Sequence, residues 1–390
     1  MAVTIRERIL RTFRREPIDR VVWQPRLYYW FYGNRLRNRP PEGANHPERV
    51  ESWYRVIEAY EGGKVPEQYR NLTLLELYRA LRSSPRYPQE TLGIDIFEVR
   101  IDESKVKVHR AVEGDKAVTV YETPRGRVQQ VSVHGYPHEH FIKGPDDIPV
   151  MIDVLEHSSF HFDEHNYRLA DEAFGDLGVI NTYYPRAPFQ RLIVDYMGFE
   201  NLVYALTDYP DKIADLLKAI EAWDDQMYEV LLASPVPILN FGDNIDANVD
   251  PPPYFERYLV PYYKKRIEQI HAAGKFCHIH MDGSLKPLLP YLGTVGFDAI
   301  EAATPKPQGD VTLEELKEAL GETILMDGIP AILFLPDTPV DELLAFAERV
   351  LDMFAPRLIL GVSDELPPGG EIERIRLISD LTEKWEVPSR

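Results

Sequence analysis

The chain has 390 residues, of which 44% are hydrophobic and 11% aromatic, and its formal net charge is −19. This length suits one large α/β barrel or two ordinary domains, and the apolar content excludes global disorder. The negative charge argues against nucleic acid and anionic membranes as partners, because both attract basic patches. Cys277 is the only cysteine, so a disulfide framework and a thiolate-rich zinc site are excluded.

Three features bear on where the protein works. Residues 1–8 are charged and have a helical pattern, without the apolar block of a signal peptide. No stretch of the chain approaches the roughly 18 apolar residues of a membrane-spanning helix. Because the chain also has a single cysteine, we expect it in the reducing cytoplasm.

The amino-terminal part is expected to be mainly helical. Helices are predicted over residues 4–15, 48–61 and 74–82. Thr4 and Thr73 are the expected N-caps of the first and the third helix. Between the first and the second helix, residues 21–24 are predicted to form a buried strand, and an aromatic run follows at residues 28–32.

Between residues 95 and 135 the hydrophobic period changes to two, which is typical of strands. The strands are expected at residues 97–101, 105–108, 117–121 and 127–131. Gly, Pro and Asp separate them, which favours an antiparallel β-meander. We expect it to be an early insertion in a single domain that spans residues 1–390.

From residue 148 onward, strand-like apolar runs alternate with helical patterns such as residues 210–232 and 254–273. The predicted strands are residues 178–182, 237–241, 276–280, 298–301, 323–326 and 358–362. This alternation predicts parallel strands joined by crossover helices. With residues 21–24 and a strand near Ile94 the strands make eight, which favours a (β/α)8 barrel over an open sheet.

In such a barrel the chemistry is carried by residues at the ends of the strands. His278 and His280 are two positions apart on one predicted strand, so their side chains share a face, about 7 Å apart. Asp282 follows at the end of that strand. Two imidazoles and a carboxylate suit a divalent metal. A pair of histidines that hold a ligand without a metal is the alternative.

Carboxylates and aromatic side chains gather at the other predicted strand ends. We expect catalytic roles for Asp243, Asp364 and Tyr183. The side chains expected to contact the substrate are Arg26, Trp23, Tyr28, Tyr184, Arg186, Asp246 and Asp282. Another histidine set, His157, His161 and His165, recurs every four residues, which predicts a stripe on an exposed helix face.

Short motifs along the whole chain occur in a characteristic order. They include Glu16-Pro17-Ile18-Asp19-Arg20, Thr123-Pro124-Arg125-Gly126, Gly144-Pro145-Asp146-Asp147, Gly242-Asp243-Asn244, His278-Ile279-His280-Met281-Asp282-Gly283, Gly296-Phe297-Asp298-Ala299-Ile300-Glu301 and Gly361-Val362-Ser363-Asp364. In these motifs the chain resembles the uroporphyrinogen decarboxylase superfamily. That superfamily includes zinc-dependent methylcobamide methyltransferases and is related to cobalamin-independent methionine synthase.

The resemblance implies a metal site. The methyltransferase branch places zinc on a His-x-Cys pair and a distant Cys, with a Glu between them in methionine synthase. At these positions the chain has His278, His280, Glu301 and Asp364, so imidazole and carboxylate replace both sulfur ligands. Such a site is harder and more Lewis-acidic, and it suits zinc, manganese or iron acting on an oxygen-bearing substrate.

The resemblance therefore implies a metal-dependent methyltransferase, with zinc as the expected metal. It would move a methyl group between a small substrate, such as a methoxylated aromatic, and a corrinoid protein. The corrinoid is expected on a separate protein, because these residues contain no Asp-x-His-x-x-Gly signature of a cobalamin domain. The superfamily also suggests a homodimer.

Two other functions stay open at this point. One is a metal-independent decarboxylase or lyase for a small carboxylated substrate, with Asp243 or Asp364 as acid and base and Arg26 or Arg186 on the substrate carboxylate. A porphyrinogen is not expected as its substrate, because the Arg-rich segment of true uroporphyrinogen decarboxylases is reduced to Arg26. The other is a non-enzymatic binding role, in which the aromatic run would fill the barrel mouth.

Overall fold

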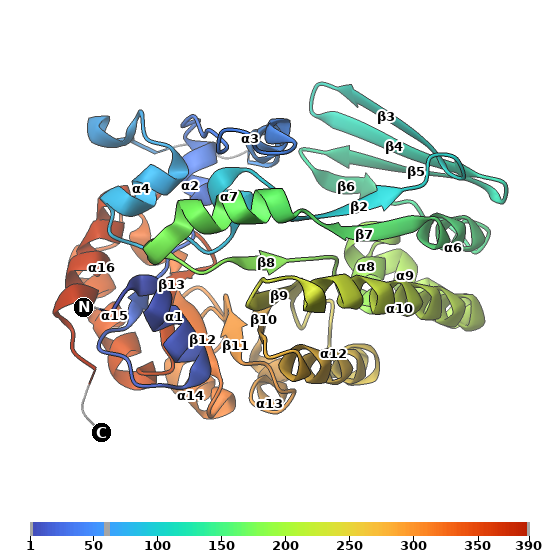
Figure 1. Ribbon diagram of the computed structural model, residues 1–390. Coiled ribbons are helices and arrows are strands. Elements are labelled where there is room, and N and C mark those ends of the chain that lie inside the picture. Colours follow the sequence, from blue (N-terminus) through green and yellow to red (C-terminus); the bar gives the residue numbers. More distant parts are fainter. Residues whose placement is uncertain (1–2, 58–62, 388–390) are drawn as a thin grey trace. The chain divides into compact units, whose positions relative to one another are not determined.

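The computed structural model describes residues 3–57 and 63–387 (Figure 1). The chain divides into two compact units. Unit 1 contains residues 1–94, 165–184 and 236–390, and unit 2 contains residues 95–164 and 185–235. The expectation of a single domain over residues 1–390 stays a prediction. Among the described residues, no helix has both the length and the apolar character needed to cross a membrane.

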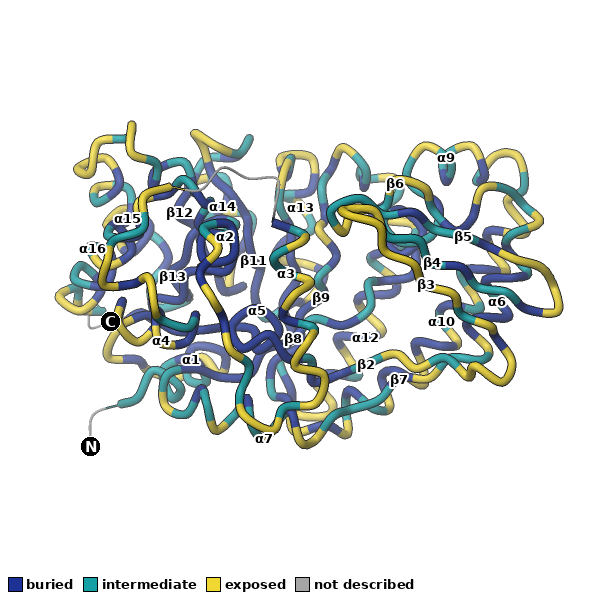
Figure 2. Tube along the Cα trace, turned by 90° about the horizontal axis from the view of Figure 1, so that it is seen from above, coloured by how far each residue is buried: buried dark blue, intermediate teal, exposed yellow. Residues whose placement is uncertain are grey.

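Unit 1 is built on a parallel sheet in the order β1-β13-β12-β11-β10-β9-β8. The strands are β1 (Val22–Trp23), β8 (Asn181–Tyr183), β9 (Ile238–Ile245), β10 (Phe276–Met281), β11 (Ala299–Glu301), β12 (Ile324–Pro330) and β13 (Leu358–Ser363). All residues of β12 and β13 are buried (Figure 2), as expected of strands that are covered on both faces. Seven of the eight predicted strands are thereby confirmed.

The eighth position of the barrel is taken by a segment without strand geometry. The Ser84 N–H donates to the Trp23 carbonyl on β1 (3.0 Å), and the Asn181 N–H on β8 donates to the Arg86 carbonyl (3.3 Å). Residues 83–87 therefore join the two edges of the sheet. Pro85 lacks a backbone donor, so a regular ladder cannot form there. The predicted strand near Ile94 is wrong, because Ile94 lies in the loop that follows a short helix.

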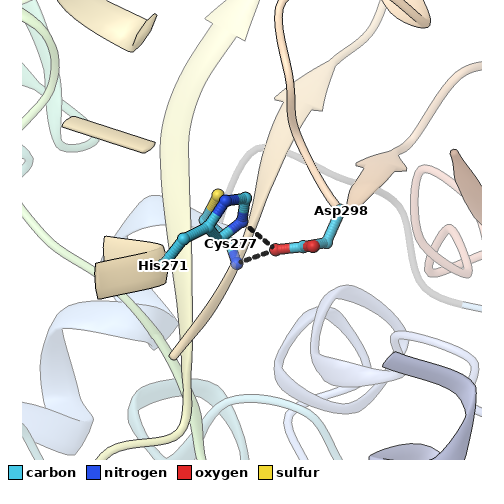
Figure 3. Close-up of side chains that lie close together, drawn as sticks. All are labelled: His271, Cys277 and Asp298. Atoms are coloured by element: carbon cyan, nitrogen blue, oxygen red, sulfur yellow. Dashed lines mark hydrogen bonds and ion pairs between the residues drawn. The ribbon is translucent and has the colours of Figure 1, made fainter. Parts of the chain in front are cut away.

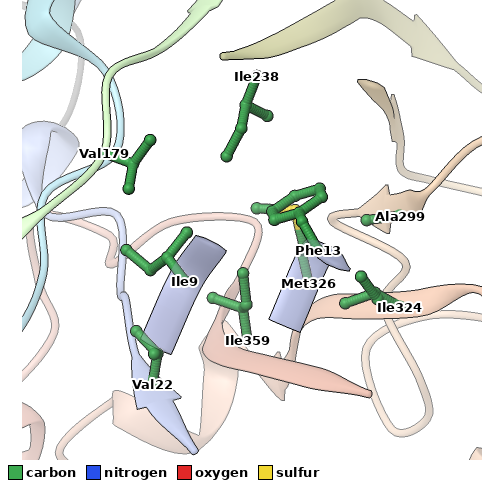
Figure 4. Close-up of a cluster of buried hydrophobic side chains, with 9 residues drawn as sticks. All are labelled: Ile9, Phe13, Val22, Val179, Ile238, Ala299, Ile324, Met326 and Ile359. Atoms are coloured by element: carbon green, nitrogen blue, oxygen red, sulfur yellow. The ribbon is translucent and has the colours of Figure 1, made fainter. Parts of the chain in front are cut away.

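Helix α1 (Ile5–Arg14) closes the amino-terminal end of the barrel. Its Ile9 and Phe13 pack against side chains from the first residues of the strands, among them Val22, Ile238 and Ile324 (Figure 4). Thr4 caps the helix as predicted, accepting a hydrogen bond from the backbone of Glu7 (3.2 Å). Apolar residues thus fill this end of the barrel.

Helices surround the sheet of unit 1 and connect its strands. They are α2 (Tyr28–Gly33), η1 (Pro47–Arg49), α3 (Val50–Val56), η2 (Glu67–Tyr69), α4 (Leu74–Ala80), α5 (Pro88–Leu92), α7 (Glu164–Phe174), η3 (Gly175–Leu177), α11 (Pro252–Tyr254), η5 (Phe255–Leu259), α12 (Val260–Ala272), η6 (Lys286–Leu288), α13 (Leu289–Leu292), α14 (Leu313–Leu320), η7 (Ala331–Phe334), α15 (Val340–Phe354) and α16 (Ile372–Lys384). The predicted Thr73 cap is confirmed as a capping box with Glu76. Of the helix predicted over residues 48–61, positions 58–61 lie outside the described residues.

Unit 2 combines two small antiparallel sheets with helices. β3 (Lys107–Glu113), β4 (Lys116–Thr123), β5 (Gly126–Val133) and β6 (Tyr136–Glu139) form one sheet, and β2 (Phe97–Ile101) pairs with β7 (Ser158–Phe162) in the other. The helices are α6 (Ile148–Glu156), α8 (Pro188–Arg191), η4 (Leu192–Tyr196), α9 (Phe199–Asp208) and α10 (Pro210–Ala233).

The predicted meander is therefore only partly right, because its first strand belongs to a different sheet. Phe97 of β2 stacks on Phe160 of β7 with the ring centroids 5.2 Å apart, and β2 pairs antiparallel with β7. The predicted histidine stripe is wrong. His157 follows α6, His161 lies on β7 and His165 lies on α7, so the three share no helix face.

Candidate active site at the strand ends of the barrel

His278 and His280 lie on β10 and are buried. The parallel register pairs His280 with Glu301, the last residue of β11. Glu301 Oε2 consequently lies 3.1 Å from His280 Nδ1 and 3.7 Å from His278 Nδ1. Two of the expected metal ligands thus lie beside one carboxylate oxygen of a third.

Asp364, the fourth expected ligand, lies on the other side of the His280 ring. Its Oδ2 is 3.6 Å from His280 Nε2, whereas Glu301 faces Nδ1. Asp364 also forms an ion pair with Arg26. An ion bound between Glu301 and His280 Nδ1 would therefore lie on the other side of the ring from Asp364.

Arg86, which the sequence reasoning missed, is the centre of a fully buried ionic group. Its guanidinium pairs with Glu301 and with Asp327 Oδ1 (2.7 Å), and its Nε donates to Gln24 Oε1 (3.0 Å). A Cβ atom at Gly361 would collide with Asp327 Oδ1, so glycine is needed there. Asp327 itself has a left-handed backbone with a φ of 78°. This group fixes the far side of the Glu301 carboxylate.

Two further donors hold Glu301 in place. The Tyr87 hydroxyl donates to Oε1 (2.7 Å), and the Asn240 amide donates to Oε2 (2.9 Å). Burial raises the pKa of Glu301, but Arg86 and the hydrogen bond from His280 outweigh it and hold the pKa well below the usual range. Glu301 is therefore an ionised, oriented carboxylate.

Arg26 forms a second ionic group beside the first. It pairs with Glu90 Oε1 at 2.6 Å, with Glu365 Oε2 at 3.3 Å and with Asp364. Tyr28 joins this group, because its hydroxyl donates to Glu365 Oε1 (3.2 Å). The guanidinium of Arg26 is thus shared among three carboxyl groups of the chain itself.

The two ionic groups together are short of positive charge. Two guanidinium groups face five carboxyl groups: Glu90, Glu301, Asp327, Asp364 and Glu365. If all five ionised, the guanidinium groups would leave three negative charges; His280, which contacts Glu301 and Asp364 and has its pKa raised, offsets one of them, so two remain for protons or a cation to neutralise. Burial raises the pKa of Glu90 to about 7 and that of Asp327 to about 6, with Arg26 and Arg86 opposing the shifts.

The two histidines differ in charge. Burial lowers the pKa of His278 to about 3, so its ring is neutral. For His280 burial also acts downward, but Asp364 and Glu301 outweigh it and raise the pKa to about 9. His278 Nδ1 and Asn181 Oδ1 are buried without a hydrogen-bond partner, and the Asn181 amide nitrogen lies 2.7 Å from His278 Nε2. A neutral imidazole with an unused ring nitrogen is a metal-binding group.

The structure positions the two predicted tyrosines and Trp23 differently. The Tyr183 ring packs against Tyr87 (5.1 Å between centroids), next to Glu301. Tyr184 is buried against Phe241. The Trp23 indole donates to the Ile375 carbonyl of α16 (3.2 Å), so this ring faces a helix rather than the histidines.

The remaining predicted residues have varied surroundings. Asp243 is fully buried and accepts a hydrogen bond from Tyr263 (2.6 Å). Asp246 accepts from the backbone of Asn248 and of Ser284, which makes it part of a turn. Burial raises the pKa of Asp282, whose charge acts on His280. Arg186 belongs to unit 2, where it pairs with Asp195 (3.2 Å).

A separate group of possible metal ligands, His271, Cys277 and Asp298, lies elsewhere in unit 1, with ligand atoms within 4.8 Å of one another (Figure 3). Asp298 Oδ2 accepts the Cys277 backbone N–H (2.8 Å) and lies 3.0 Å from His271 Nε2. Cys277 alternates with His278 along β10 and so faces the other side of the sheet. Burial raises the pKa of its thiol well above the usual range, which disfavours the thiolate that a metal requires.

Comparisons with known proteins agree with this architecture. The family model of uroporphyrinogen decarboxylase matches residues 186–385, just over half of the chain. No curated protein matches. A methyltransferase from Methanosarcina mazei has 14% identity and a TM-score of 0.58, with 98% of this chain and 99% of that chain covered, and it has the same fold.

A B12-independent methionine synthase from Shewanella sp. W3-18-1, solved in complex with selenomethionine, has 12% identity and a TM-score of 0.46. The alignment covers 94% of this chain and 96% of that chain. The family match extends over five of the barrel strands, β9 to β13, and includes both histidines, Glu301 and Asp364. The chain belongs to the uroporphyrinogen decarboxylase family.

Proposed function

We propose that the protein is a metal-dependent methyltransferase. It moves a methyl group between a small oxygen-bearing substrate, such as a methoxylated aromatic, and a corrinoid carried by a separate protein. The observation that carries this proposal is the approach of His278 and His280 to one oxygen of Glu301, at 3.7 and 3.1 Å. Two imidazoles and one carboxylate are a common ligand set for a catalytic divalent metal.

The residues fit such an ion in two respects. His278 Nδ1 is buried without a hydrogen-bond partner, and the five surrounding carboxyl groups exceed the two guanidinium groups and the charged His280 ring by two. A divalent cation would satisfy the nitrogen and compensate the charge. His278, His280 and Glu301 would hold it, and zinc is the metal we propose. A bound zinc ion supplies Lewis acidity, which polarises a substrate oxygen.

The surrounding residues would orient these ligands. Arg86, Tyr87 and Asn240 hold the Glu301 carboxylate, so one of its oxygens is directed toward the histidines. The Asn181 amide lies against His278 Nε2. Its nitrogen there would place the ring proton on Nδ1, whereas its oxygen, which is buried without a hydrogen-bond partner, would accept from Nε2–H and leave Nδ1 free for the ion. Asp364 lies near His280 Nε2 and would stabilise positive charge on that ring or accept its proton.

A decarboxylase would need a cation available for the substrate carboxylate. Arg26 is already shared among Glu90, Asp364 and Glu365, and Arg186 is paired with Asp195. A substrate carboxylate would have to displace the chain's own carboxylates from these guanidinium groups. The arrangement therefore favours methyl transfer over decarboxylation.

Methyl transfer can be assayed directly. The zinc-loaded protein is mixed with 2-methoxyphenol and cob(I)alamin, and the absorbance change that accompanies methylcobalamin formation is followed. We expect turnover by the parent and by the control variant His271→Ala, and none by His280→Ala. Release of carbon dioxide from 2-methoxybenzoate, without any methylcobalamin, would overturn the proposal in favour of the decarboxylase.

A further inference from the structure

Unit 2 contains a pocket of about 270 Å³ that lies entirely within its own elements. Its walls come from the two small sheets, from α6 and from the segment that contains α8 and η4, and Trp223 of α10 completes them. This pocket shares no residue with the histidine site of unit 1. At roughly 30 Å³ per water molecule, the volume equals about nine waters, enough for a six-membered ring with a few substituents.

The walls are largely apolar and partly flat. Tyr121 and Phe141 stack on each other with their planes 17° apart, and Trp223 contributes a third aromatic wall. Met151 and Val154 add aliphatic surface from α6. Val99 lines the pocket and is 48% exposed, so apolar surface at the opening contacts solvent. Flat aromatic walls favour a planar ligand.

The charged groups at one side of the pocket are already paired. Arg191 is buried, forms an ion pair with Asp224 and donates to the Arg186 carbonyl (2.9 Å). Asp195 pairs with Arg186 at 3.2 Å. Two cations and two anions balance, so a charged ligand would lose its hydration without gaining a counter-ion. The Asp195 carboxylate can still accept a hydrogen bond from an uncharged donor.

We propose that this pocket is a second binding site, which takes a small, planar, uncharged molecule with one hydroxyl donor, a phenol by chemical class. The ring would lie among Tyr121, Phe141 and Trp223, and the hydroxyl would donate to Asp195. This site does not depend on the metal or on the reaction proposed for unit 1.

The test uses the full chain with methionine labelled with carbon-13 at the methyl group. Met151 lines the pocket, and its signal among those of the seven methionines is assigned with a Met151→Leu variant. Phenol is titrated against the protein, followed by anisole, which lacks the donor, and benzoate, which is charged. We expect a saturable shift of the Met151 signal, with a phenol dissociation constant on the order of 1 mM.

A matched pair of variants locates the binding. Val99 and Val112 are exposed strand valines of unit 2, at 48% and 56%, and only Val99 lines the pocket. Val99→Trp should fill the opening and weaken phenol binding at least tenfold, about 1.4 kcal/mol. Val112→Trp and His280→Ala should leave it unchanged. Anisole should bind about threefold to tenfold more weakly than phenol, and benzoate should give no saturable shift.

Several results would overturn the proposal. An unsaturated or absent Met151 shift with phenol would show that the pocket holds no such ligand. Equal binding by Val99→Trp would place the ligand elsewhere, and benzoate binding as tight as phenol binding would contradict the balanced charge. Loss of binding in His280→Ala would contradict the separation of the two sites.

Discussion

Glu301 and His280 are side by side because β10 and β11 are parallel and in register, and Glu301 Oε2 lies 3.1 Å from His280 Nδ1. The opposite oxygen of the same carboxylate is held by Arg86 and Tyr87. One carboxylate thus connects the histidine pair to a buried guanidinium. This relationship leads to predictions about stability as well as about metal binding.

Replacing Arg86 by methionine should strongly destabilise the protein. The change would leave Glu301 and Asp327 buried without their counter-charge, which costs about 3–5 kcal/mol. Urea unfolding at neutral pH measures the effect. The control is Arg6→Met, which breaks the half-exposed pair with Asp171 and should cost at most about 1 kcal/mol. Equal effects of the two substitutions would contradict the role given to Arg86.

Shortening Phe13 should show how much the closure of the barrel end contributes. Phe13 is 2% exposed and packs in the cluster of strand-end side chains, so Phe13→Ala should lower the free energy of unfolding by about 3–5 kcal/mol. The same substitution type at Tyr204, which is 63% exposed, should change it by no more than about 0.5 kcal/mol. A small effect at Phe13 would mean that α1 does not close the barrel.

The buried thiol of Cys277 predicts a dependence of stability on pH. Burial raises its pKa well above the usual range in the folded state, whereas the pKa of a cysteine thiol in an unfolded chain is about 8.5. The stabilisation is therefore complete below about pH 8.5 and is lost as pH rises above it, because only the unfolded chain then releases the proton. Between pH 9 and pH 10 the parent should lose up to about 1.4 kcal/mol more than Cys277→Ala does. Parallel pH profiles of the two proteins would refute this.

Asn181 should tune metal affinity without binding the metal. Its amide lies 2.7 Å from His278 Nε2, so Asn181→Ala would remove the group that orients the ring. A loss of about 10-fold to 100-fold in zinc affinity is expected, measured by competition with a chromogenic chelator. Asn201→Ala, which changes an asparagine of unit 2, serves as the control and should bind zinc like the parent. Equal zinc affinity of the two variants would contradict a role of Asn181 in orienting His278.

Much of the barrel could be predicted from sequence because its strands are short apolar runs between amphipathic helices. Strand ends predicted that His278 and His280 share a face, and the resemblance to the methyltransferase branch added Glu301 to them. Arg86 was missed because residues 83–87 carry two serines and a proline, which give no strand signal although they occupy a strand position. The prediction instead put this strand near Ile94, several residues after the segment that occupies the position, so Arg86 was not recognised as lying at a strand end.

Other differences arise from tertiary pairing. Trp23 was expected near the substrate, but alternation along β1 turns it toward α16, and that alternation was readable from the sequence. The ion pairs of Arg26 with Glu90 and Glu365 could not be predicted from the sequence, because they depend on how α5 and the segment after β13 meet in the fold. For the same reason the sequence could not show that Asp364 faces the opposite nitrogen of His280 from Glu301.

The most direct test of the central claim is the metal content of the untagged protein, measured by plasma mass spectrometry beside two variants. We expect about one equivalent of zinc, or of manganese or iron, in the parent and in His271→Ala, and essentially none in the double variant His278→Ala/His280→Ala. Metal that persists in the double variant but disappears from His271→Ala would assign it to the cluster with Cys277. A parent that takes up no metal even after reconstitution would contradict the metal-dependent methyltransferase outright.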